Sequence, residues 1–307
     1  MLPFILQQSG LAAPPLLAAG FGELLAERAG IINVGIEGTM LTGAAAAYAA
    51  ALLTGSPWPA IPIAMLAGIL MALLFAIPAV WFAADQIVTG TALNILAAGS
   101  TATAARLLER YTDTHPTPGE SPHFDPINLN TTFPTLNSIL HQYALLYLLL
   151  PLIPLLHFAL TRTRLGLTLR ALGDNPDAAA AAGTRVRLAR TAILLLAGAL
   201  SGLAGAYLST MRNHAFQPNM TSGQGFLVLA LVIFARWNIP LFALAVLAFS
   251  LLNGLQSYLT TTPTPIPRQL FDMLPYIATL TALLFLTQNK TKTIAPIHLA
   301  RPWPEAP

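Results

Sequence analysis

The chain has no cysteine and very little charge. Only 9% of its 307 residues are charged, whereas about 25% is usual in soluble globular domains. The lack of cysteine excludes disulfides and thiolate metal sites. A soluble domain of this size would need far more charge on its surface, so the shortage of charge favours lipid as the surrounding solvent.

Catalytic signatures are also missing. The sequence has no GxxxxGK[ST] phosphate-binding loop, so we expect that the chain does not hydrolyse ATP itself. It has no HExxH or GxSxG motif, no carboxylates paired for acid/base work and no basic face for nucleic acid. The histidines are scattered, and the three in one predicted loop, His115, His123 and His141, are weak candidates for a metal site. We therefore expect no catalytic residue, no metal and no cofactor in this chain.

Long apolar stretches are what the sequence does contain. It is 55% hydrophobic with a mean hydropathy of +0.65. Residues 38–84 include no Asp, Glu, Lys or Arg, and this stretch is long enough for two membrane crossings at about 20 residues each. The first 22 residues carry no Lys or Arg, so they lack the basic start of a signal peptide and are interpreted as an uncleaved first span.

Comparable stretches along the chain predict an all-α, polytopic transmembrane helix bundle with about 8–10 spans. We expect one transmembrane domain over residues 1–307. The predicted spans are 4–24, 34–54, 60–84, 86–106, 142–160, 191–211, 223–235, 239–259 and 272–288. Spans 34–54 and 223–235 are rich in Gly and polar residues, so either could be broken or re-entrant, the first near residues 30–45.

The placement of Lys and Arg predicts the orientation. The 161–190 loop holds six arginines and is expected to be cytoplasmic, because cytoplasmic loops of membrane proteins are enriched in Lys and Arg. Alternation from this loop puts eleven basic residues inside and four outside, which together make the 15 in the chain. The N-terminus is then outside, the C-terminus is cytoplasmic, and the 109–141 loop is extracytoplasmic.

The segment from Glu23 to Gly38 interrupts apolar sequence with three carboxylates and three glycines. Charge at membrane depth is costly and usually marks function. Glu37 either caps the backbone N–H groups of a helix start or lines the solute path, and Asn33 has the same two interpretations. In 86–94, helical spacing puts Gln86, Gly90 and Asn94 on one face. Those amides either bond neighbouring helices or contact solute, so Asn33, Glu37, Gln86 and Asn94 are the candidate translocation-path residues.

Two further segments carry local structural signals. Asn175 suits a helix N-cap, Pro176 the first helical position and Asp177 the first turn. The alanines that follow predict a short, slim helix that Gly183 ends, which either fits a groove of a partner protein or lies at the membrane interface. Gly198, Gly202 and Gly205 predict close packing between helices.

Taken in order, these segments resemble the permease family of ABC importers for branched-chain amino acids, ribose and nucleosides, and most closely its nucleoside and simple-sugar branch. The residues that carry the resemblance are Gly22-Glu23, Glu27-Arg28-Ala29-Gly30, Asn33-Val34-Gly35-Ile36-Glu37-Gly38, Thr91-Ala92-Leu93-Asn94, Arg170 to Ala179, Gly198 to Gly205 and Gly225 to Asn238.

The resemblance implies a membrane-spanning permease subunit in the bacterial inner membrane, which moves nucleosides or simple sugars such as ribose by alternating access. It implies four kinds of partner: a separate ABC ATPase that binds ATP and Mg²⁺, a second and non-identical permease, an extracytoplasmic solute-binding protein and membrane lipid. It also implies that the short alanine helix couples to the ATPase. The coupling residues would be Leu172, Gly173, Asp174, Asn175, Pro176, Asp177, Ala178, Ala179 and Gly183. A branched-chain amino acid permease and a secondary transporter are the alternatives.

Overall fold

The computed structural model describes residues 1–114, 121–127, 137–138, 140–262, 267–273, 277, 281 and 295–303. Within this part of the chain every regular element is helical, apart from an isolated antiparallel bridge between Ile127 and Gln142. The expected all-α bundle is confirmed. The predicted span 272–288 lies largely outside the described residues.

Seven helices are long and apolar enough to cross a membrane. They are α1 (Leu2–Arg28), α2 (Ile36–Thr54), α3 (Ala60–Ala76, extended by a π-helical segment Ile77–Trp81), α4 (Gln86–Thr114), α6 (Ala144–Arg162), α9 (Val186–Ala206, extended by Tyr207–Arg212) and α11 (Ile239–Thr261). The shorter helices are α7 (Arg164–Asp174), α8 (Pro176–Ala181), α10 (Gln224–Phe234) and α12 (Arg268–Asp272).

Helix α10 corrects the expected span 223–235. It has 11 residues, and at 1.5 Å per residue it is only about 16 Å long. A hydrocarbon core of about 30 Å needs nearly twice that length. Helix α10 therefore enters the bundle without crossing it.

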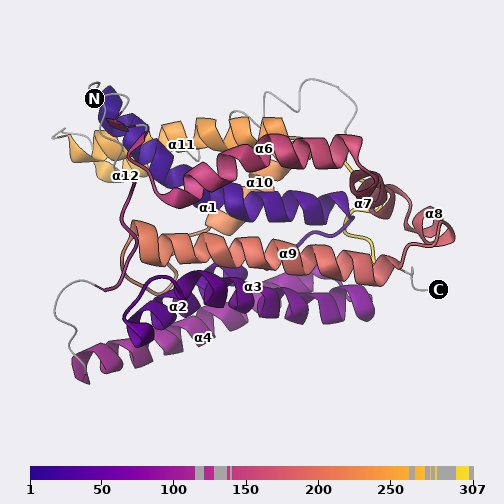
Figure 1. Cartoon of the computed structure of the whole chain (residues 1–307), viewed down its shortest axis with the longest axis horizontal. Helices are drawn as coiled ribbons and strands as arrows, with labels where there is room; N and C mark the ends of the chain where they lie inside the picture. Colours follow the sequence, from indigo (N-terminus) through magenta and orange to yellow (C-terminus); the bar gives the residue numbers. More distant parts are fainter. Residues whose placement is uncertain are drawn as a thin grey trace.

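Helix α1 is the central element of the bundle. It packs against α9, α11, α10 and α6 (Figure 1), and every residue from Ala12 to Glu27 is buried, including Phe21 and Leu24. Pro14 and Pro15 lie inside it, yet the helix continues to Arg28. Buried packing on all sides holds the helix where the prolines remove backbone hydrogen bonds.

Glycines set the close approach of α9 to α2 and α3. A methyl group on Gly198 or Gly202 would collide with the backbone of Gly68 or Ala64 in α3, and one on Gly205 with the backbone of Met40 in α2. Such contacts let helix backbones approach closely in a membrane protein, where dispersion contacts rather than hydrophobic burial hold helices together.

The helical structure is interrupted between α1 and α2. Residues 29–35 are not helical, and Gly30 turns the chain with a φ of +87°, in the left-handed region where glycine has no steric penalty. The chain returns along the end of α1, and α2 then starts inside the bundle. The break lies at the start of the region, near residues 30–45, where a broken helix was expected.

Candidate functional site

Two helices start side by side inside the bundle. A methyl group on Gly225, in the first turn of α10, would lie 2.6 Å from the backbone nitrogen of Glu37, in the first turn of α2. The break before α2 and the chain reversal before α10 thus meet at one place. Irregular backbone at such a depth is tolerated only where it is covered by protein or lines a cavity.

Glu37 holds the start of α10. Its Oε1 accepts a hydrogen bond from the backbone N–H of Gly223 at 2.8 Å, and its Oε2 accepts one from Gly225 at 2.6 Å. The side chain is buried, with 7% of the residue exposed. The carboxylate therefore satisfies N–H groups that a helix start leaves unpaired, at the positive end of the helix dipole. Its direct contact with solute stays a prediction.

Side chains from α1 and α4 hold the broken backbone itself. The Oε1 of Glu23 accepts a hydrogen bond from the backbone N–H of Asn33, and the Oε1 of Gln86 accepts one from Ile32, both at 2.9 Å. The Oδ1 of Asn33 accepts a hydrogen bond from Gly35 at 3.1 Å. Each of these contacts gives a partner to a buried or half-buried backbone N–H that has no helical hydrogen bond.

Asn94 bridges the break to the start of α2. Its Nδ2 donates to the Val34 carbonyl oxygen at 2.9 Å, and its Oδ1 accepts from the Gly38 N–H at 2.8 Å. The four candidate path residues are thus brought together around residues 32–38. All four side chains form hydrogen bonds with backbone groups. These bonds give them a structural role in addition to the predicted role in the translocation path.

The other end of α10 is fixed to α1. Arg28 donates two hydrogen bonds to the Trp237 carbonyl oxygen, at 2.9 and 2.7 Å, and the indole N–H of Trp237 donates to Glu27. Trp237 is 4% exposed. Sequence reasoning missed this link, because Arg28 and Trp237 are 209 residues apart and an Arg-Trp pair at 236–237 looks like an interface anchor.

The short helix α8 has the local structure that its sequence indicates. The Asn175 side chain caps it by accepting from the Ala178 N–H at 2.9 Å, and Gly183 follows with a φ of +87°. Of the candidate coupling residues, five are exposed: Asp174, Asn175, Asp177, Ala178 and Gly183. The other four are buried against the rest of the chain: Leu172, Gly173, Pro176 and Ala179.

Arg190 ties this region to the break after α1. Its guanidinium donates to the Ala29 carbonyl oxygen at 3.1 Å and to the Leu172 carbonyl oxygen at 3.0 Å. The residue is 3% exposed. Arg190 thus bonds the end of α7 to the non-helical segment that leads to Glu37.

Residues 295–303 form a second connection between the end of α1 and the α7–α8 region, which the sequence did not indicate. The backbone N–H of His298 donates to Gly173 at 2.8 Å, and that of Ala300 donates to Gly30 at 3.1 Å. The Trp303 indole N–H donates to the Asp177 carboxylate at 2.7 Å. This segment contacts both the end of α1 and the α7–α8 region.

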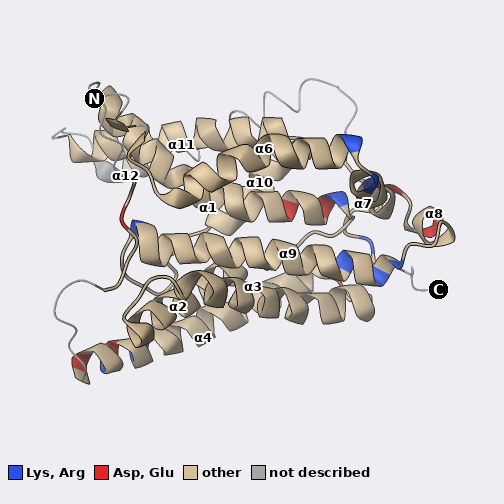
Figure 2. Ribbon diagram, in the orientation of Figure 1, with Lys and Arg blue, Asp and Glu red and all other residues tan. Residues whose placement is uncertain are grey.

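Charge differs between the two ends of the bundle. The ribbon positions coloured blue for Lys and Arg are concentrated at the end that carries α7 and α8 (Figure 2). They include Arg162, Arg164, Arg170, Arg185 and Arg187 of the loop that the sequence analysis assigned to the cytoplasm. The opposite end carries the C-terminal end of α4, with Glu109, Arg110 and Asp113.

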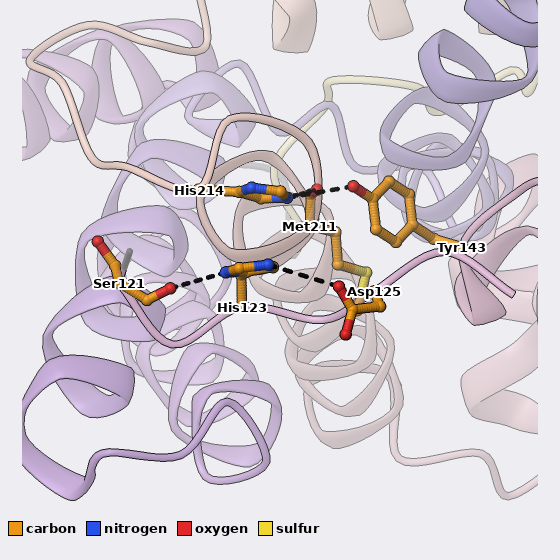
Figure 3. A network of polar contacts seen from close by, with 6 residues as sticks. All are labelled: Ser121, His123, Asp125, Tyr143, Met211 and His214. Carbon is orange, nitrogen blue, oxygen red and sulfur yellow. Dashed lines mark hydrogen bonds and ion pairs between the residues drawn. The ribbon is translucent and has the colours of Figure 1, made fainter. Parts of the chain in front are cut away.

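At that opposite end, two histidines join residues 121–127 to the end of α9 (Figure 3). The rings of His123 and His214 stack with centroids 4.1 Å apart. His123 also lies 3.5 Å from Asp125, and the Nε2 of His214 lies 3.2 Å from the Tyr143 hydroxyl. The cluster packs a loop onto the bundle. Of the other two candidate histidines, His141 lies two residues before Tyr143 in the chain and His115 falls outside the described residues.

Comparison with known proteins identifies the family. Residues 5–283 match the family model described as branched-chain amino acid transport system / permease component. The chain is 32% identical to the guanosine ABC transporter permease protein NupQ of Bacillus subtilis, over 92% of each chain. It is 34% identical to the nucleoside ABC transporter permease protein NupC of Lactococcus lactis, over 96% of this chain and 95% of the relative. It is 31% identical to the putative glucose ABC transporter permease protein TsgC13 of Haloferax volcanii, over 80% and 74%.

These matches agree with the helices described above and with the family that the motifs indicated. A permease of this kind is a multi-pass membrane protein that works with an ATPase and a binding protein. This family membership excludes the secondary-transporter alternative. The chain belongs to the branched-chain amino acid transport system permease family and is the non-catalytic permease component of an ABC transporter.

Proposed function

We propose that the chain forms, with a second and non-identical permease, the membrane path of an importer for nucleosides. The observation that carries the proposal is the near full-length similarity to a guanosine permease and a nucleoside permease. Simple sugars such as ribose are the second candidate, since a relative is named for glucose. Branched-chain amino acids are the third, from the description of the family.

The helix break supports a solute path at this place. Discontinuous helices near the middle of the membrane commonly form the solute site of transporters. Here α2 and α10 both begin inside the bundle, and their broken backbone is held by Gln86, Asn94 and Glu37. In the proposed mechanism this region changes shape when the ATPases close, because ATP favours one of two permease conformations.

The orientation follows from the charge pattern. We place α7 and α8 in the cytoplasm of a bacterial cell, since the basic loop lies at their end of the bundle (Figure 2). The N-terminal end of α1 is then extracytoplasmic, together with the His123–His214 cluster. The solute-binding protein would dock at that outer end.

The nine candidate coupling residues would have two different roles, depending on whether they are exposed or buried. The exposed ones, such as Asp177 and Ala178, would contact the ATPase, while buried ones such as Leu172 and Ala179 would position α8. A slim alanine helix can enter a groove because it has little side-chain bulk. Ala178→Glu would add both bulk and charge on the exposed face.

Two measurements test this function. Uptake of labelled guanosine, ribose and leucine is measured in cells that express the permease with its ATPase, partner permease and binding protein. We expect guanosine uptake that stops when the ATPase cannot hydrolyse ATP; uptake of leucine alone, or uptake independent of ATP, would contradict the proposal.

The second measurement is co-purification of the ATPase. Ala178→Glu should lose the ATPase while the permease remains folded in the membrane. The matched control is Gln217→Glu, which adds one charge at an exposed position on the opposite end. Equal ATPase retention by both variants would rule out α8 as the docking element.

A further inference from the structure

A partly enclosed cavity lies beside the start of α10. It is formed by α1, the end of α9, the start of α10 and the middle of α11. Its lining residues are Ala12, Leu16, Arg212, Ser222, Gly223, Gln224, Leu227, Phe249 and Asn253. Ala12 and Leu16 lie near the midpoint of α1, which spans Leu2–Arg28. The cavity is therefore at mid-depth, adjacent to the helix start that Glu37 caps.

Three polar side chains in this lining have no partner in the described part of the chain. The Oε1 of Gln224 is buried and accepts no hydrogen bond. The guanidinium of Arg212 and the amide of Asn253 make no hydrogen bond or ion pair with any described residue. Buried polar groups normally have partners, so the Oε1 of Gln224 lacks a donor. Arg212 and Asn253 are half-buried and line the same cavity, so the three side chains can offer both donors and acceptors to a ligand.

The charge around the cavity selects against a positively charged ligand. Arg212 is a cation, the α10 N-terminus is the positive end of a helix, and no carboxylate lines the cavity. The nearby Glu37 has both oxygens occupied by the α10 start. An ammonium group would be repelled here, which disfavours an amino acid.

The size of the cavity and the planar shape of its polar groups favour a ligand that inserts one planar edge. The cavity volume is about 90 Å³, smaller than the ~150 Å³ cavity that holds a benzene molecule. It therefore admits one edge of a solute and not a whole nucleoside. Guanidinium and amide groups are planar, and Arg, Asn and Gln pair with nucleobase edges by two parallel hydrogen bonds.

We infer that Arg212, Gln224 and Asn253 form a subsite that binds the hydrogen-bonding edge of a nucleobase during transport. Leu16, Leu227 and Phe249 supply the apolar walls beside that edge. The rest of the solute lies outside this cavity, in the remainder of the path. The inference rests on the proposed function and names which part of the nucleoside this chain recognises.

The absence of cysteine makes the test direct. Single cysteines are placed at Leu227 and Ser222, which line the cavity and are not among the three proposed hydrogen-bonding groups, in the complete permease–ATPase complex in nanodiscs. Their modification by a small, water-soluble thiol reagent is followed by mass spectrometry of this chain. Thr114→Cys is the control, because Thr114 is exposed at the outer end of α4, away from the cavity.

We expect both cavity cysteines to react, and uridine or guanosine to slow their modification about tenfold when present at about ten times its dissociation constant. Thr114→Cys should react at the same rate with and without nucleoside. A cavity cysteine that does not react, or that nucleosides do not protect, would overturn the subsite. Protection by glucose or leucine alone would overturn its assignment to a nucleobase.

A parallel uptake measurement separates this inference from the proposed function. If the wild-type importer does not take up nucleosides, the proposed function fails. If it does, and Arg212→Gln impairs nucleoside uptake no more than Arg110→Gln, the subsite alone fails. Arg110 is the matched control because it is exposed on α4; the expected outcome is at least a tenfold loss of uptake for Arg212→Gln only, which corresponds to ~1.4 kcal/mol.

Discussion

The Oε1 of Glu37 lies 2.8 Å from the backbone nitrogen of Gly223, although the two residues are 186 positions apart. Through this contact the start of α2 holds the start of α10. One carboxylate thus joins the two helix starts inside the bundle.

Glu37→Gln should destabilise the protein. The amide can still accept with its one oxygen, but its NH₂ group faces an N–H donor, so one hydrogen bond to a charged group is lost. Such a bond contributes about 1.5–3 kcal/mol. Thermal unfolding of the complex in detergent would measure the loss, and Glu109→Gln, exposed on α4, should leave the unfolding temperature unchanged.

Gly225→Ala tests whether the two helix starts must touch. The added methyl group would lie 2.6 Å from the Glu37 nitrogen and 2.7 Å from its Cα, so α10 must move away. We expect severe loss of solute uptake with the protein still in the membrane. Gly99→Ala in α4 is the control, since a methyl group there has nothing within 4 Å and should be neutral or slightly stabilising; equal uptake by both variants would show that the contact is dispensable.

Asn94→Leu removes the bridge across the break. It leaves the Val34 carbonyl oxygen and the Gly38 N–H without the partner that Asn94 provides, and a buried unsatisfied group costs about 1–3 kcal/mol. We expect lower yield and a lower unfolding temperature. Thr91→Val, one turn earlier and exposed, serves as the control, and a stable Asn94→Leu protein would argue against a structural role for Asn94.

Trp303→Phe tests the tie between residues 295–303 and α8. The variant keeps an aromatic ring and loses only the N–H that donates to Asp177. If this contact helps to position α8, transport per ATP hydrolysed should fall while the unfolding temperature stays close to wild type. Trp58→Phe provides the comparison, because Trp58 is exposed in the turn between α2 and α3; unchanged coupling in Trp303→Phe would remove this segment from the mechanism.

Local sequence determined the elements of the fold. The long uncharged stretches required helices in lipid, because lipid offers no hydrogen-bond partners to an exposed backbone. Asn175, Pro176 and Gly183 determined the bounds of α8, since capping acts between residues a few positions apart. The spacing of Gln86, Gly90 and Asn94 also placed them on one face, and all three lie against residues 32–38.

Only the tertiary structure decided what that face contacts and how α10 is held. The bonds from Glu37 to Gly225 and from Arg28 to Trp237 join residues about two hundred positions apart, and no local pattern encodes such a distance. The same holds for the cavity, whose lining comes from α1, α9, α10 and α11. A carboxylate in apolar sequence must find a partner in the bundle, but the partner is chosen by how the helices pack.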